Sequence, residues 1–249
     1  MTDGSWNIRH RAVTGSTNQD ALDGEPGDVF TADVQTAGRG RLNHRWLSQP
    51  GENLTMSAVI GVDGLPPEEV ATLPLVVGFA AADMVKGALL DMGEAERAGG
   101  VRLKWPNDVL VRGRKICGIL CERSGGRVIA GIGLNANQVQ FPAELEGRAT
   151  SLAAETGSDR IDLTNLRDNL LRRLGDSLAA WRQRGFAAIW PKVAQIDFLK
   201  GLAVSVERMD GDPEPVSGEC GGIQPDGSLL VGGERIFAGE AHVAFRSRP

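Results

Sequence analysis

The chain has 249 residues, of which 41% are hydrophobic and 24% charged, and it carries a formal net charge of −5 at neutral pH. These values suit a globular protein with one sizeable core and a small second domain, and the acidic balance argues against general nucleic-acid binding. The N-terminal residues lack the apolar stretch of a secretory signal, no apolar run approaches the roughly 20 residues that cross a bilayer, and three cysteines are too few for a disulfide framework. We therefore expect a cytoplasmic protein that binds neither nucleic acid nor membrane.

Short apolar runs separated by turn residues indicate an α+β fold. Predicted strands cover residues 28–34, 54–62, 101–105, 116–122 and 128–134. Pro66 and Pro67 open a predicted helix in which Leu73 and Met84 belong to one apolar face. Pro74 lies early enough in this helix to be accommodated with a kink.

A second long predicted helix, followed by a change in the hydrophobic pattern, marks the C-terminal part of the chain. Leucines at 163, 166, 170, 174 and 178, followed by Trp181, keep helical spacing, and Gly185 stands where a helix commonly ends. Beyond Asp197 short alternating runs and turns predict a small antiparallel barrel or sheet of about fifty residues, a size that is marginally stable alone. We expect two domains, residues 1–198 and residues 199–249.

The segment GSTN, Gly15–Asn18, places three short hydrogen-bonding side chains just before a predicted helix start at residues 19–22. Such residues commonly cap a helix N-terminus. They would equally suit a small polar cup for the heteroatoms of a ligand, and the segment alone leaves both interpretations open.

Residues 35–46, QTAGRGRLNHRW, crowd basic side chains into one stretch of an acidic chain. Gly38 and Gly40 suit neither a helix nor a strand interior, so the stretch is a predicted loop. It is either a solvated surface turn or a loop that closes over an anion with guanidinium groups and backbone N–H donors.

The segment LKWPNDV ends a predicted strand. Pro106 keeps Trp105 extended, so Asn107 and Asp108 are expected to turn. Together with Lys104 they then lie at the edge of the sheet, where a cation and a carboxylate suit a phosphate and its metal ion.

Glycines interrupt the next two apolar strands, in GRKICGIL and GIGLN. Gly118, Gly131 and Gly133 indicate either bulges or a group that approaches the backbone closely. Lys115 begins one strand and Asn135 ends the other, so both are expected to face the same rim.

In their order and spacing, the segments GSTN, QTAGRGR, KWPND, GRKICGIL and GIGLN resemble the biotin protein ligases, the enzymes that attach biotin to carrier proteins. The resemblance covers nearly the whole chain. It implies an α+β catalytic domain with a mixed β-sheet, similar to the class II aminoacyl-tRNA synthetases, followed by a small SH3-like β-barrel. With GSTN so close to the N-terminus, it implies the short form that lacks the DNA-binding domain of some members.

The resemblance also assigns residues to roles. The biotin contacts of the family match Ser16, Thr17, Asn18, Gln35, Arg39, Gly40, Arg41 and Lys115, and its pocket glycines match Gly118, Gly131 and Gly133. The adenylate contacts match Trp46, Asn107 and Asn135, with Lys104 and Asp108 nearby and Arg246 as a weaker match. Lys115 with Arg39 or Arg41 would cancel the repulsion between two reacting anions, and Asp108 would serve Mg²⁺ on the phosphates.

The implied reaction has two steps. ATP and biotin would form biotinyl-5′-AMP and pyrophosphate, and a lysine amine of a biotin carboxyl carrier domain would then attack the acyl-adenylate. Two interpretations compete with this one. The chain could be a lipoate-protein ligase, or a protein that holds biotin or its adenylate without transferring it. The sequence does not decide whether the chain forms a homodimer.

One departure from the family concerns the loop. The family usually continues GRGRRGRxW, whereas this chain has GRGRLNHRW, so Leu42 and His44 replace two cations and Asn43 replaces a glycine. Because asparagine tolerates a positive φ better than most residues, we expect Asn43 to preserve the turn.

Overall fold

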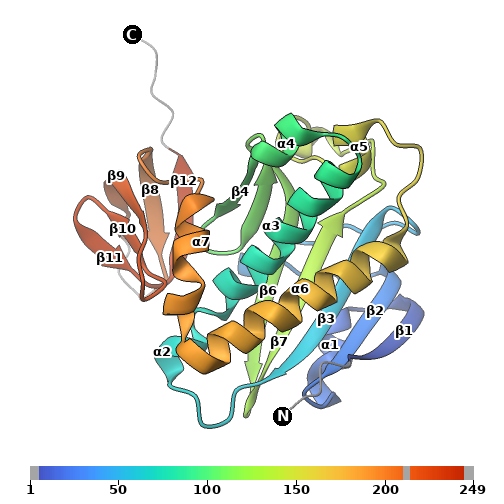
Figure 1. The fold of residues 1–249 in the computed structure, drawn as a ribbon, viewed down its shortest axis with the longest axis horizontal. Helices are drawn as coiled ribbons and strands as arrows, with labels where there is room; N and C mark the ends of the chain where they lie inside the picture. The colour runs from blue at the N-terminus through green and yellow to red at the C-terminus, as the bar shows by residue number, and fades with distance from the viewer. Residues whose placement is uncertain (1–5, 210–213, 244–249) are drawn as a thin grey trace.

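The computed structural model describes residues 6–209 and 214–243, which form two β-sheets with helices packed against them (Figure 1). The larger sheet has the strand order β1-β2-β3-β7-β6-β5-β4. Its strands are β1 (Asn7–Thr14), β2 (Asp28–Gln35), β3 (Asn53–Gly61), β4 (Val101–Lys104), β5 (Asp108–Val111), β6 (Arg114–Ser124) and β7 (Arg127–Asn135). Because β1 runs parallel to β2 while the other neighbours are antiparallel, the sheet is mixed, as expected.

Two of these strands differ from the sequence prediction. Strand β1 was not predicted, because most of its side chains are exposed and polar at the edge of the sheet. Asp108 does not turn but begins β5, where it pairs with Lys104 across the hairpin that Trp105, Pro106 and Asn107 close.

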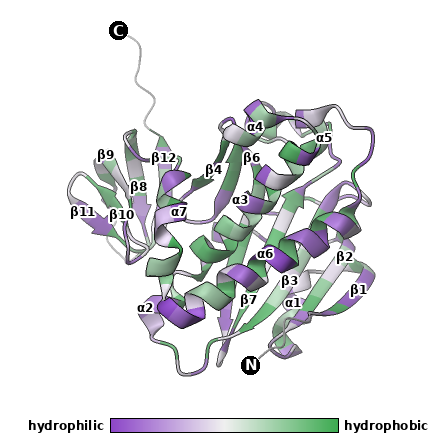
Figure 2. Cartoon of the chain, in the orientation of Figure 1, coloured by the Kyte–Doolittle hydropathy of each residue, from purple (hydrophilic) through white to green (hydrophobic). Residues whose placement is uncertain are grey.

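Helices cover the larger sheet. They are α1 (Thr17–Asp20), α2 (Pro67–Val70), α3 (Leu73–Asp91), α4 (Ala95–Gly99), α5 (Leu152–Thr156), α6 (Leu163–Arg184) and α7 (Trp190–Gln195), with 3-10 turns at Ala21–Asp23, Arg41–Asn43, Ala143–Leu145 and Phe186–Ala188. Helices α3 and α6 pack against each other and cover one face of the sheet (Figure 1). Figure 2 shows strongly hydrophobic residues in α3 and in the strands behind it.

The predicted helix after Pro66 is confirmed in its apolar face, since Leu73 and Met84 are buried, but it is divided in the structure. It is two helices, α2 and α3, and Pro74 lies in the first turn of α3, where a missing N–H costs little. Helix α3 is also buried on more than one face, with Leu75 and Ala82 enclosed as well as Leu73, because it packs against both the sheet and α6.

This burial explains a further correction. Residues 67–91 are long and apolar enough to cross a membrane by length and composition, contrary to the sequence expectation. The apolar window is 61% buried inside the fold. Its composition is therefore that of a core helix that packs against other protein elements on several sides.

The predicted stripe of α6 is confirmed, since Leu166, Leu170, Leu174, Leu178 and Trp181 are buried. The Asp162 carboxylate caps its N-terminus by accepting from Thr164 N at 2.8 Å, and Gly185 ends it with φ 68°.

The smaller sheet is antiparallel, with the order β11-β10-β9-β8-β12. It consists of β8 (Ala203–Arg208), β9 (Val216–Ile223), β10 (Leu229–Val231), β11 (Glu234–Ile236) and β12 (Gly239–Val243). Two tryptophan N–H groups join it to the rest: Trp105 Nε1 donates to Gly227 O at 3.1 Å and Trp190 Nε1 to Ile223 O at 2.7 Å. The hydrophobic core continues across this junction, so the smaller sheet is held beside the edge strand β4.

Candidate active site

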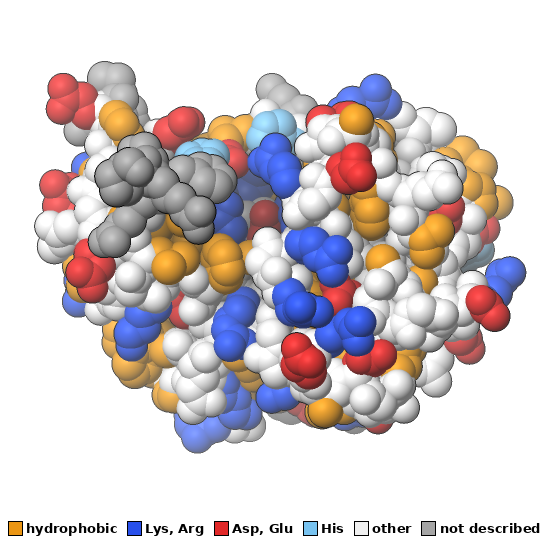
Figure 3. All heavy atoms as spheres, turned by 90° about the horizontal axis from the view of Figure 1, so that it is seen from above, with side chains coloured by type: hydrophobic (Ala, Val, Ile, Leu, Met, Phe, Trp, Pro, Cys, Tyr) orange, Lys and Arg blue, Asp and Glu red, His pale blue; other side chains and the backbone are white. Residues whose placement is uncertain are grey.

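A cleft lies on the face of the larger sheet that α3 and α6 leave open. The Ile119 side chain points toward Gly78 of α3, so its neighbour Gly118 faces the other way, into the cleft. The smaller sheet closes one side of the cleft through Glu240 of β12. Figure 3 shows Lys and Arg side chains gathered beside a hollow between the two parts of the molecule.

The structure brings together nearly all the residues singled out in the sequence. Those that line the cleft are Ser16, Thr17, Asn18, Gln35, Arg39, Gly40, Arg41, Trp46, Lys104, Asn107, Asp108, Lys115, Gly118, Gly131 and Gly133. Arg246 lies outside the described residues. Asn135 lies on the same face of β7 as the two glycines but does not line the cleft.

The segment GSTN forms a polar cup at the floor of the cleft. Thr17 N donates to Gln35 Oε1 at 2.8 Å, and Ser57 Oγ of β3 lies 2.6 Å from Asn18 Oδ1 and 2.7 Å from Thr17 Oγ1. An amide oxygen can only accept, so the Ser57 hydroxyl donates to Asn18. Within the described residues the Ser16 hydroxyl caps no backbone group, which favours the ligand cup over the helix cap.

Glu122 completes the cup and was missed in the sequence. Its Oε2 accepts from Asn18 Nδ2 at 2.6 Å, which orients the Asn18 amide, and the same carboxylate lies 3.2 Å from Arg39 Nη2. Ser57 was missed as well. The signal for Glu122 was its spacing: in a strand, residues 118, 120 and 122 share one face.

The strand glycines make room for side chains, as expected. A Cβ at Gly131 would overlap the Asn18 amide, and one at Gly133 would overlap the Trp46 ring, which also lies over Gly118. The Trp46 indole N–H is buried with no hydrogen-bond partner among the described residues. Buried donors usually have a hydrogen-bond partner, and this N–H would gain one from a bound ligand.

The loop of residues 36–46 is folded over the cup. Gly40 N donates to His44 O at 2.7 Å and Trp46 N to Gly38 O at 2.9 Å. The left-handed residue of the turn is Leu42, with φ 52°, and not Asn43 as expected. A leucine in this conformation is strained, because its Cβ crowds the backbone.

Cations line the other end of the cleft. Lys115 Nζ lies 2.7 Å from Asp108 Oδ1, and Arg41 Nη2 donates to Gly239 O of β12 at 3.1 Å. Burial lowers the pKa of Lys104, while the charges of Asp108 and Glu240 partly offset that effect. Burial lowers the pKa of Arg41 in the same way. Burial disfavours the charged forms of Lys104 and Arg41, and a bound anion would stabilise these charges again.

The amide of Asn135 is used inside the protein. Its Oδ1 accepts from Asn53 Nδ2 at 3.1 Å, and its Nδ2 donates to Thr150 O at 3.0 Å. Each end of the side chain makes one hydrogen bond inside the protein and keeps a second donor or acceptor position, so the expected adenylate contact by Asn135 stays a prediction.

The chemistry of the cleft is electrostatic. Cys117 is fully buried, and burial raises the pKa of its thiol to about 12, so it is no nucleophile near neutral pH. Among the described residues there is no cluster of three His, Cys, Asp or Glu side chains that could cage a metal ion. What the cleft offers is a hydrogen-bonding cup that leads to a group of cations, an arrangement that suits a polar ligand with a carboxylate next to a phosphate.

Comparison with known proteins agrees with this geometry. A model of the Biotin/lipoate A/B protein ligase family matches residues 9–138. The biotin–[acetyl-CoA-carboxylase] ligase of Mycobacterium tuberculosis is 37% identical over 177 residues, which cover 69% of this chain and 64% of that protein. The bifunctional ligase/repressor BirA of Bacillus subtilis is 33% identical over 216 residues, covering 82% of this chain and 61% of that protein.

The likeness extends to solved structures. The biotin protein ligase of Aquifex aeolicus in complex with biotin and ATP superimposes with a TM-score of 0.81 at 28% identity, covering 96% of this chain and 98% of that one. The chain spans 61% and 64% of the length of the two curated relatives. The resemblance drawn from its five segments is confirmed, and the chain belongs to the Biotin/lipoate A/B protein ligase family.

Proposed function

We propose that the protein is an ATP-dependent ligase that activates biotin as biotinyl-5′-AMP and transfers it to a lysine of a biotin carboxyl carrier domain. The observation that carries this proposal is the continuity of the cleft, in which the polar cup of Thr17 and Asn18 leads directly to Arg41, Lys104 and Lys115. The complex of the A. aeolicus relative with biotin and ATP supports it.

In the first step a carboxylate oxygen of biotin attacks the α-phosphorus of ATP, the new P–O bond forms, and pyrophosphate leaves. Both reactants are anions, so their repulsion is the first barrier. Lys115 and Arg41 lower it by neutralising the carboxylate and the α-phosphate oxygens, and Arg39, half-exposed and paired with Glu122, also lines the cleft. The cup residues fix the ring of biotin, so that binding positions the reacting carboxylate.

Mg²⁺ fits the cleft as an ion carried by the phosphates. It typically keeps several waters and binds through one or two carboxylates plus substrate phosphates. Asp108 and Glu240 are the acidic side chains that line the phosphate end, and of these Asp108 would hold the ion. The ion would add positive charge beside the phosphates, while Lys115, released from Asp108, would turn to the substrate.

In the second step the lysine amine of the carrier attacks the acyl carbon and AMP leaves. The mixed anhydride must be protected from water until then. Trp46 and the folded loop of residues 36–46 cover the strand glycines and would provide this protection.

The smaller sheet would be the SH3-like barrel of the family, with the domain boundary at residues 198–199. The protein would act in the cytoplasm on biotin, ATP and the carrier domain, and the net charge of −5 favours the absence of a nucleic-acid partner.

Transfer can be tested directly by mass spectrometry of a biotin carboxyl carrier domain after incubation with the protein, Mg²⁺, ATP and biotin. We expect the mass of one biotinyl group on one lysine. An unmodified carrier, together with a lipoylated lipoyl domain when lipoate replaces biotin, would assign the protein to lipoate transfer instead. Formation of the adenylate without transfer to either domain would indicate a protein that only holds the intermediate.

A further inference from the structure

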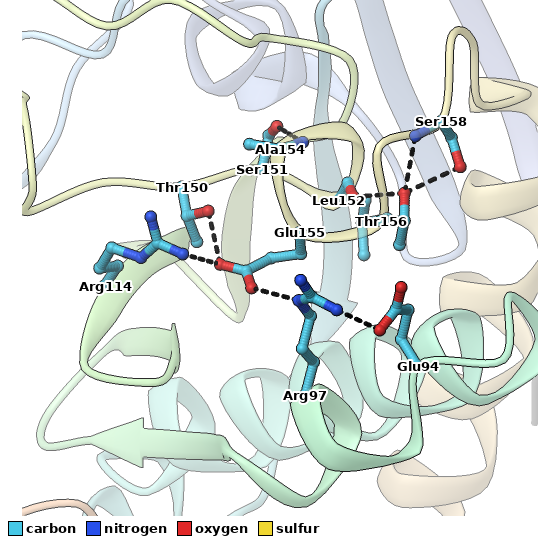
Figure 4. Close-up of polar contacts among 10 residues, drawn as sticks. All are labelled: Glu94, Arg97, Arg114, Thr150, Ser151, Leu152, Ala154, Glu155, Thr156 and Ser158. Carbon is cyan, nitrogen blue, oxygen red and sulfur yellow. Dashed lines mark hydrogen bonds and ion pairs between the residues drawn. The ribbon is translucent and has the colours of Figure 1, made fainter.

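A buried ion-pair cluster lies outside the cleft, where α4, α5 and the start of β6 meet (Figure 4). The Glu155 side chain of α5 is fully buried, at 0% exposed, between Arg97 of α4 and Arg114 of β6. Taking a carboxylate out of water is costly unless cations and hydrogen bonds satisfy it in a defined geometry. The cluster therefore fixes three elements relative to one another, and nothing in the proposed reaction uses it.

The two oxygens of Glu155 are held unequally. Oε1 accepts from Arg114 Nη2 at 2.6 Å and from Thr150 Oγ1 at 2.7 Å. Oε2 lies 3.3 Å from Arg97 Nε without the alignment of a hydrogen bond. The better-formed contacts therefore join Glu155 to Arg114 and Thr150 and not to α4.

Arg114 and Thr150 both adjoin Lys115. Lys115 N donates to Arg148 O at 2.8 Å, and Thr150 N donates to Lys115 O at 2.8 Å, so residues 148–150 bind both the N–H and the C=O of Lys115. Pairing of β6 with β7 begins only at Cys117, and its pairing with β5 is irregular beside Lys115. Lys115 lies opposite Leu110 of β5, and its N–H and C=O bind residues 148–150, so both neighbours fix its main chain.

We propose that Glu155 is a positioning residue for Lys115. Through Oε1 it holds Arg114, the residue before Lys115, and Thr150, whose N–H binds the Lys115 carbonyl. The carboxylate fixes the main chain from which Lys115 reaches the cleft. The inference rests on the proposed function, because it is the reaction there that requires Lys115 to be accurately placed.

The test compares variants that spare Glu155 itself, whose loss would remove the acidic partner of Arg114 and leave Arg97 with Glu94. Thr150→Val and Arg114→Met each remove one partner on the Lys115 side. Arg97→Met is the matched control, since Arg97 and Arg114 are similarly exposed, at 34% and 39%, but only Arg114 adjoins Lys115.

The first readout is hydrogen exchange at the amides of Lys115 and Thr150, which needs no substrate. We expect faster exchange in Thr150→Val and Arg114→Met and unchanged exchange in Arg97→Met. Equal protection in all three variants would overturn the proposal, and this outcome does not depend on whether the protein activates biotin.

The second readout is biotin-dependent exchange of pyrophosphate into ATP. Misplacing a catalytic group from a distance costs up to about a hundredfold, so kcat should fall about tenfold or more in Thr150→Val and Arg114→Met. KM for biotin and ATP should stay within about threefold of the parent values. The substitutions weaken a contact made in the transition state and leave the binding of the substrates unchanged. Arg97→Met should retain the parent kcat.

A double-mutant cycle separates positioning from a general loss of structure. On a Lys115→Ala background, Thr150→Val should have no further effect on kcat, because it acts through Lys115. An unchanged kcat in Thr150→Val, or an additive loss on the Lys115→Ala background, would overturn the proposal. Absence of biotin-dependent pyrophosphate exchange in the parent protein would refute the proposed function instead.

Discussion

At the scale of single residues, the cleft is built from side chains that constrain one another. Glu122 orients the Asn18 amide, and Asp108 holds Lys115 at 2.7 Å. Each acid keeps a polar or cationic group in place until a ligand arrives. Removing a ligand-facing cation should therefore affect turnover more than folding.

Lys115→Ala is expected to lower the rate of biotin-dependent pyrophosphate exchange about a hundred- to thousandfold, the usual effect of losing one electrostatic contact to a transition state. The measurement is made at saturating ATP and biotin. Lys86→Ala, on the exposed side of α3, is the control and should match the parent. A rate for Lys115→Ala within about threefold of the parent would move the role to Lys104 or Arg41.

Because of Lys104, the affinity of the protein for ATP should depend on pH. Burial lowers its pKa, and bound phosphates would raise it again, so ATP binding takes up a proton between the free and bound pKa values. Affinity for ATP should consequently fall as pH rises through this range. Calorimetry in two buffers of different ionisation enthalpy measures the uptake, and Lys104→Arg should abolish it, because a guanidinium stays charged. Equal uptake by the parent and Lys104→Arg would contradict this role.

At the scale of elements, the loop of residues 36–46 carries strain at an unexpected place. Because Leu42 adopts φ 52° and is exposed, its side chain brings no burial to offset the left-handed conformation. Other members of the family usually have a cation at this position, so the loop of this chain differs in charge as well.

Leu42→Gly should therefore stabilise the closed loop and slow the release of a biotinyl-AMP analogue, by roughly five- to tenfold if about 1 kcal/mol of strain is relieved. Stopped-flow dissociation with and without the substitution measures this. Leu47→Gly is the matched control, since Leu47 is equally exposed but has no positive φ, and it should not slow release. Faster release from Leu42→Gly than from Leu47→Gly would show that Leu42 contacts the ligand.

At the scale of the whole molecule, local patterns predicted the long helix α6 and five of the strands, and the family resemblance of five segments predicted most of the residues that line the cleft. They succeeded where a signal repeats along the chain, as in the buried leucines of α6, or where a turn and a glycine mark a strand end. They failed where the cause is distant in sequence. Ser57 reaches the cup only through the pairing of β3 with β7, and β1 is polar because it lies at an edge.

Asn135 shows the same limit from the other side. Its place at the end of a glycine-interrupted strand predicted a ligand contact, which stays a prediction, and no local pattern indicated that its amide also bonds to Asn53 and Thr150, residues distant in the sequence. The hydrogen-bond partners of a polar residue at a strand end depend on tertiary contacts that the local sequence does not encode.

The first step proposed for this cleft joins biotin to the α-phosphate of ATP, and the reverse of that step is measured as exchange of pyrophosphate into ATP. With Mg²⁺, ATP and labelled pyrophosphate, the protein should incorporate label into ATP when biotin is present, and not when lipoate or octanoate replaces it. Exchange with lipoate or octanoate but not with biotin, or no exchange with any of the three acids, would contradict the account.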